Sequence, residues 1–77
     1  MFPKGIFINL SKNKLIIFEK DFDNPENEGF VCYWQIDDHN VYKLIFKKRL
    51  TKEKANEMFN NLTKEGWSLT QDKYNAA

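Results

Sequence analysis

The sequence predicts an α+β fold, in which a four-stranded antiparallel sheet of two hairpins carries one C-terminal helix on one face. Three observations predict this fold. Four runs rich in β-branched and aromatic residues come first in the chain. Short polar segments of the kind that form turns separate the runs of each pair. One stretch with the spacing of an amphipathic helix, Leu50–Trp67, follows them.

The first predicted hairpin joins Gly5–Leu10 to Lys14–Lys20 through the polar turn Ser11–Asn13. Asn13 is suited to the left-handed conformation that a loop of this length usually needs. Apolar side chains occur on both faces of both strands. A strand of this kind is covered on both faces, or it leaves one face for a partner.

The second predicted hairpin joins Phe30–Ile36 to Val41–Leu50 through the polar turn Asp37–Asn40. Alternation along a strand places every second side chain on the same face. In the third strand this puts Val31, Tyr33 and Gln35 on the face opposite to Phe30, Cys32, Trp34 and Ile36. In the fourth strand we expect Tyr42, Leu44 and Phe46 on the core. We expect the intervening residues to face solvent or a ligand: Lys43, Ile45 and Lys47.

The helix carries its own start and stop signals. Thr51 is a good N-cap, because its hydroxyl accepts a hydrogen bond from a free amide of the first turn. Gly66 is the expected left-handed stop, and Trp67 beyond it can pack back on Leu62. The apolar stripe between them follows helical spacing: Ala55, Met58, Phe59 and Leu62. A short fifth strand can follow at residues 67–71, and residues 72–77 are expected to form a frayed tail.

The composition predicts a single domain, residues 1–77, with an ordered core at 5–71. The net charge of +1 gives no overall attraction to nucleic acid or to an anionic membrane. The single cysteine cannot form an intramolecular disulfide. No apolar run reaches the length of a membrane span, and the start of the chain lacks the pattern of a signal peptide. We therefore expect a soluble, cytoplasmic protein.

The polar clusters do not have the pattern of a catalytic or metal site. Asp21–Asn24 begins like a calcium loop, but Pro25 stands where a ligand is needed. Asp37–His39 lies in a hairpin turn, where adjacent side chains rarely converge on one metal. Cys32 has no nearby base and is best interpreted as a buried structural thiol. We expect no catalytic residues, no metal and no cofactor, and therefore no enzyme.

Two functions remain open from the residues alone. The first is a small protein-binding or regulatory module that uses the uncovered sheet face or an edge strand, with a protein partner or a second copy bound there. The alternative is a weak nucleic-acid-binding domain that uses a basic patch where the fourth strand meets the helix. Lysines on a strand edge also serve simply to discourage aggregation. The candidate binding residues are Tyr33, Lys43, Ile45, Lys47, Lys48, Arg49 and Lys52.

The C-terminal half also resembles a known pattern. Arg49-Leu50-Thr51, Glu53, Ala55, Leu62 and Gly66-Trp67 resemble the signature of a small uncharacterised family found in marine picocyanobacteria and their phages. Phe59 stands where that family has tryptophan. The opening strand from Gly5 and the turn at Asn13 are similar to the start of the same family. Because the family is a domain of unknown function, the resemblance implies a source and a fold more than an activity.

A weaker resemblance connects the chain to small sheet-and-helix DNA readers. The ethylene-response-factor domain and the arm-site domain of tyrosine recombinases also run through three strands into a helix that opens as Thr51–Ala55 does. These domains read DNA with arginine and tryptophan on the exposed sheet face. This chain departs from that pattern, because Arg49 is its one arginine.

Overall fold

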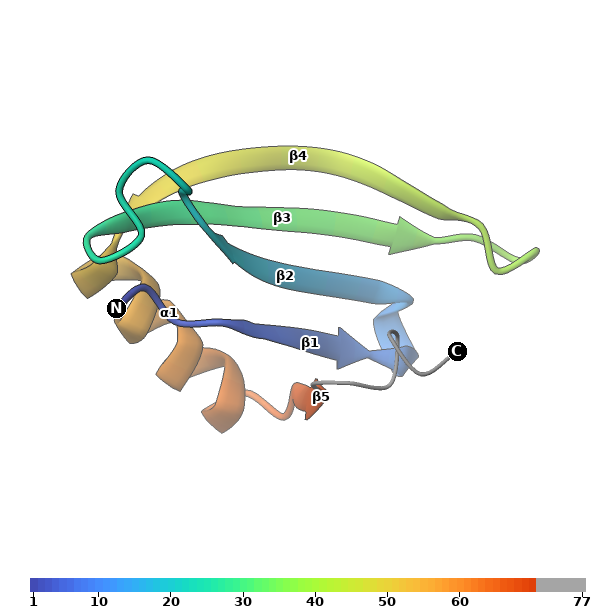
Figure 1. Ribbon diagram of the computed structural model, residues 1–77. Helices are drawn as coiled ribbons and strands as arrows, with labels where there is room; N and C mark the ends of the chain where they lie inside the picture. The colour runs from blue at the N-terminus through green and yellow to red at the C-terminus, as the bar shows by residue number, and fades with distance from the viewer. Residues whose placement is uncertain (71–77) are drawn as a thin grey trace.

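The computed structural model describes residues 1–70 and confirms the predicted α+β fold. One antiparallel sheet has the strand order β4-β3-β2-β1-β5, and a single helix packs on it (Figure 1). The predicted fifth strand is present and pairs with β1. The predicted frayed tail, 72–77, lies outside the described residues. The elements are β1 Gly5–Asn9, β2 Lys14–Lys20, β3 Glu28–Ile36, β4 Tyr42–Thr51, α1 Lys52–Lys64 and β5 Ser68–Thr70.

The turn between β1 and β2 forms as the sequence predicts, with a short 3-10 segment at Leu10–Lys12. Asn13 adopts the left-handed conformation with φ 54°. The side-chain carbonyl of Asn9 accepts hydrogen bonds from the Ser11 hydroxyl at 2.8 Å and the Lys12 amide at 3.3 Å. These local bonds close the first hairpin, and the Asn13 carbonyl also accepts a hydrogen bond from the Ile36 amide of β3 at 2.8 Å.

The main core lies between the helix and the sheet, over its central strands. Phe7, Phe18 and Val31 are fully enclosed on the sheet side. Phe59 of α1 meets the ring of Phe7 edge-on, with centroids 4.7 Å apart, and that of Phe18 at 5.4 Å. Ring contacts of this kind add to the free energy of burying the rings. Through Phe59 the helix therefore packs on β1 and β2.

The helix begins and ends where the sequence predicts. The Thr51 hydroxyl accepts a hydrogen bond from the Lys54 amide at 3.4 Å. At the other end Gly66 has φ 88°, and the Trp67 amide donates to the Leu62 carbonyl at 3.1 Å. That hydrogen bond is the long closure of a Schellman motif. It sends the chain back toward the sheet, where β5 pairs with β1.

The prediction for the faces of β4 is wrong in part, because β4 contains a bulge. The register pairs Tyr33 with Phe46 but Trp34 with Leu44, so Ile45 is an extra residue. A bulge of this kind reverses the alternation of side chains beyond it. Phe46 faces the helix side, as expected, whereas Leu44 faces the opposite side.

The same bulge moves two further side chains of β4 away from their expected faces. Tyr42 pairs with Ile36 and so lies on the side opposite to the helix, and Lys43 pairs with Gln35 on the helix side. Lys47 lies opposite Cys32, away from the helix, as expected. The three residues assigned to the core are all exposed, with 41% for Tyr42, 45% for Leu44 and 49% for Phe46.

Candidate functional site: the outer edge of β4

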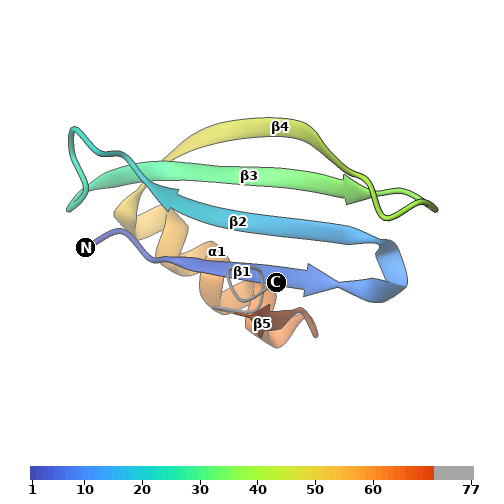
Figure 2. The ribbon, with the colours of Figure 1, turned by 45° about the vertical axis from the view of Figure 1, so that its right-hand side comes forward.

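The outer edge of β4 is the most exposed part of the sheet. Within residues 1–70 the strand has a neighbour, β3, on one side only, and it runs along one border of the sheet in both ribbon views (Figures 1 and 2). Every residue from 42 to 49 is exposed. Among them Ile45 is 54% exposed and Phe46 is 49% exposed. Exposed apolar residues such as Ile45 and Phe46, on a strand edge that no other strand of residues 1–70 covers, are typical of a surface that pairs with another chain.

The positively charged residues of β4 form two rows, one on each side of the strand. On the helix side Lys43 lies opposite Gln35, and Lys48 lies opposite Val31. Phe46 stands between these two lysines on the same side. Lys47 and Arg49 project from the other side. No acidic residue occurs anywhere in 42–51.

Arg49 is held by carboxylates of the protein itself. Its Nη1 atom donates to Asp21 Oδ2 at 2.7 Å and to Glu28 Oε1 at 3.2 Å. Its guanidinium also lies 4.7 Å from the ring centroid of Phe30. The hydrogen bond from Arg49 is the largest cause of a lowered pKa for the Asp21 carboxyl, followed by the Asp23 amide. Arg49 therefore ties β4 to the loop between β2 and β3.

Lys47 is engaged in a similar way. Its Nζ atom lies 4.5 Å from the Phe30 ring centroid and 3.8 Å from Glu19 Oε2. Both ends of this ion pair are largely exposed, so it contributes little to stability. Lys47 and Arg49 thus share one aromatic ring and face the acidic residues of the β2–β3 region.

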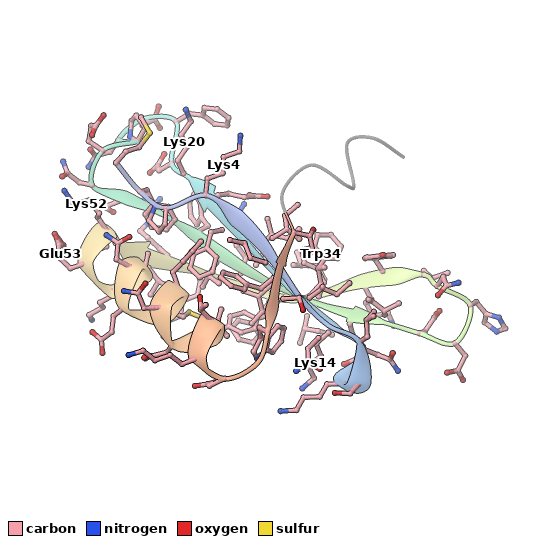
Figure 3. All side chains as sticks on the ribbon, turned by 90° about the horizontal axis from the view of Figure 1, so that it is seen from below. Lys4, Lys14, Lys20, Trp34, Lys52 and Glu53 are labelled. Atoms are coloured by element: carbon pink, nitrogen blue, oxygen red, sulfur yellow. The ribbon has the colours of Figure 1, made fainter. Side chains whose placement is uncertain are left out.

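Lys43 and Lys48 differ from Lys47 and Arg49 in their ion pairing. No carboxylate of residues 1–70 forms an ion pair with either of them. Lys52 lies further along, at the start of α1 beside Glu53 (Figure 3), and its backbone amide donates to Asn27 O at 2.7 Å. The seven residues predicted from sequence therefore do not form one patch. Lys43, Ile45 and Lys48 share the edge, and Phe46 joins them.

Tyr33 supports this edge from within the sheet. Its ring stacks on Phe46 with centroids 4.2 Å apart and an interplanar angle of 19°. Its hydroxyl points toward Met58 of the helix, with oxygen and sulfur 3.8 Å apart. Burial raises the pKa of the Tyr33 hydroxyl. Phe46 lies on the helix side, as alternation predicts, but it is 49% exposed because β4 is the border strand of the sheet.

A cavity of about 250 Å³ lies beside this stack, on the helix side of the sheet. Tyr33, Phe46 and Trp67 contribute aromatic walls, and Lys14 and Gln35 contribute polar groups. The cavity is not predictable from the sequence, because its lining comes from three strands and the segment after α1. The full lining is Lys14, Leu15, Ile16, Tyr33, Trp34, Gln35, Ile45, Phe46 and Trp67.

The candidate catalytic and metal-ligating residues Asp37 and Cys32 have structural roles. Asp37 closes the β3–β4 turn, because its carboxylate accepts hydrogen bonds from the amides of His39 at 2.8 Å and Val41 at 2.9 Å. Cys32 is buried, and burial raises the pKa of its thiol. Within residues 1–70 no three His, Cys, Asp or Glu side chains are grouped to hold a metal ion. None of the helices in that range is long and apolar enough to cross a membrane.

Comparison of the chain with protein-family models, with curated proteins and with solved structures gave no match. The resemblance to the picocyanobacterial family therefore stays a prediction.

Proposed function

We propose that the protein is a small peptide-binding module that adds a strand of a partner protein to the outer edge of β4. The observation that carries the proposal is the exposure of every residue from 42 to 49 on a strand with one neighbour. Main-chain hydrogen bonds to such an edge provide affinity, and the side chains that flank it provide specificity. The strand is long enough to hold several such bonds.

The charge of the edge selects the kind of partner. On the helix side the exposed ring of Phe46 lies between two lysines, Lys43 and Lys48, that have no ion pair within residues 1–70. Opposite charges placed across neighbouring strands stabilise the pair, and like charges destabilise it. The partner segment therefore carries an apolar residue flanked by acidic residues on one face.

A second copy of this chain is a poorer occupant of the edge. Residues 42–51 contain four cations and no acidic side chain. Pairing β4 with another β4 brings no carboxylate opposite those cations in any register, and most registers place cation opposite cation. We therefore favour a different protein over the homodimer, and light scattering at high protein concentration is expected to give the mass of a monomer.

The test uses a short acetylated probe peptide with the central sequence Glu-Thr-Val-Thr-Glu. Titration into isotope-labelled protein, followed by amide chemical shifts, is expected to move the signals of β4 first. A scrambled peptide of the same composition, with its glutamates adjacent, is expected to bind more weakly. A probe methylated at alternate backbone nitrogens is expected to lose binding, because it cannot complete the ladder.

Matched variants separate the effect of charges on the β4 edge from the effect of net charge on probe binding. Lys43→Glu with Lys48→Glu is expected to weaken probe binding about ten-fold. Lys12→Glu with Lys54→Glu changes the net charge equally at exposed sites away from the edge and should leave binding nearly unchanged. Equal binding of the methylated probe would overturn strand addition. Tighter, salt-dependent binding of a single-stranded RNA oligonucleotide would favour the nucleic-acid alternative instead.

A further inference from the structure

The cavity beside the Tyr33–Phe46 stack has the form of a separate ligand site. It opens on the helix side of the sheet, and Trp67, just after the helix, borders it. Its volume is about 250 Å³. An apolar cavity of ~150 Å³ in another protein is large enough to bind benzene. This cavity is therefore large enough for one aromatic ring with a short side chain.

The lining favours an aromatic ligand. Tyr33 and Phe46 present a stacked pair of rings, and Trp67 adds an indole. Ile16, which is 4% exposed, provides an aliphatic floor. Aromatic rings pack on one another in offset or edge-on arrangements that add to the gain from burial. An aromatic body fits these walls better than a sugar or another strongly polar molecule.

The rim of the cavity is cationic. Lys14 lines it directly, and the register places Lys14, Gln35 and Lys43 in one row across β2, β3 and β4. Neither lysine forms an ion pair with a carboxylate of residues 1–70. The Gln35 side-chain amide donates a hydrogen bond from Nε2 to the Asn13 carbonyl oxygen at 3.4 Å. In Figure 3 Lys14 lies near the β1–β2 turn, well apart from Lys52 at the helix start.

We propose that this cavity binds a small aromatic carboxylate, with the ring against Tyr33, Phe46 and Trp67 and the carboxylate toward Lys14. The occupant is a small molecule rather than a side chain of the peptide proposed for β4. Neighbouring strands lie ~4.8 Å apart, so a strand added beyond β4 lies ~10 Å from β3, with Phe46 between them. The site therefore goes beyond the proposed function and does not depend on it.

Titration of isotope-labelled protein with phenylpropionate tests the site. Amide shifts are expected to change at the lining residues and to saturate. Phenylpropionamide has the ring without the charge and is expected to bind about five-fold more weakly, whereas propionate has the charge without the ring and is expected not to saturate. Equal binding of the acid and the amide would overturn the role of the cationic rim. Shifts that avoid the lining residues would overturn the site itself.

Two variants make the assignment specific. Lys14→Glu is expected to weaken phenylpropionate binding at least about five-fold, whereas Lys12→Glu, two residues away in the exposed turn, is expected to leave it within about two-fold. Phe46→Ala removes one wall at a half-exposed position, so the fold should persist while binding is lost. If Lys14→Glu and Lys12→Glu weaken phenylpropionate binding equally, the assignment of the site is wrong. Phe46 borders both sites, so Lys14, which lies two strands from the β4 edge, is the position whose variant separates phenylpropionate binding from binding of the probe peptide.

Discussion

The ring of Phe2 lies against the backbone of Gly29, at the start of β3. A Cβ atom built on Gly29 would lie 2.6 Å from two carbons of that ring, and closer still to the carbonyl oxygen of Glu19. Phe2 is only 3% exposed, and its amide donates to Pro25 O at 3.2 Å. Phe2 is therefore part of the core, and Gly29 makes room for its ring.

Gly29→Ala is expected to destabilise the protein by about 2 kcal/mol, because the added methyl group must displace either the ring or the strand backbone. In a domain of this size that loss lowers the melting temperature by ~8–16 °C. Urea unfolding followed by tryptophan fluorescence measures the change. An alanine variant as stable as the parent would show that the ring does not pack as described.

The double variant provides the control. Phe2→Ala removes the ring and leaves the contact with the Glu19 carbonyl. If ring and glycine are coupled, Gly29→Ala costs less in the Phe2→Ala background than in the parent, by about 0.5 kcal/mol or more. If the losses of stability in the two single variants simply add in the double variant, the contact between the Phe2 ring and Gly29 is contradicted.

The parts of the fold that the sequence predicts correctly depend on neighbours in the chain. Thr51 caps the helix three residues from its donor, Asn13 adopts the left-handed conformation within its own turn, and Gly66 ends the helix it follows. Each is a local signal with a local physical cause. Alternation alone likewise assigned the faces of β3 correctly, because that strand has no extra residue.

The parts that the sequence does not predict depend on residues far apart in the chain. The bulge at Ile45 is a property of the pairing of β4 with β3, and it alone moved Leu44 off the expected face. The burial of Phe2 requires Gly29 beside it, and nothing near either residue indicates that. The cation cluster was predicted as one patch, but Arg49 is bound to Asp21, 28 positions away. Such partners appear only once the strands are in register.

The ion pair between Arg49 and Asp21 predicts a pH dependence of stability. The pKa of Asp21 is lowered in the folded protein, first by the Arg49 hydrogen bond. Because the folded pKa lies below the unfolded value, the contribution is present above the ordinary aspartate range and is lost as the pH falls through the folded pKa. The urea midpoint of the protein should therefore exceed that of Asp21→Asn at neutral pH. The difference should shrink below about pH 4.

The Arg49→Gln variant isolates the cause of that shift. Removal of the guanidinium should let the pKa of Asp21 rise toward its ordinary value of 3.8, as followed by the carboxyl carbon signal in an NMR titration. The Asp23 amide remains as a donor to the carboxylate at 3.0 Å, so part of the lowering should persist. An unchanged pKa in this variant would mean that Arg49 does not bind Asp21 in solution.

Cys32 is expected to react slowly with thiol reagents in the folded protein. The side chain is 3% exposed, and burial, followed by the Glu19 carboxylate, raises the pKa of the thiol above its ordinary value of 9.0. Because the thiolate is the reactive form, a raised pKa and restricted access both slow the reaction. At pH 8 the rate with iodoacetamide should be at least about ten-fold lower than in urea-unfolded protein. Glu19→Gln removes the carboxylate and leaves the burial, so it should restore only a small part of the rate. Labelling of the folded protein at the unfolded rate would show that the sheet face around Cys32 opens to solvent.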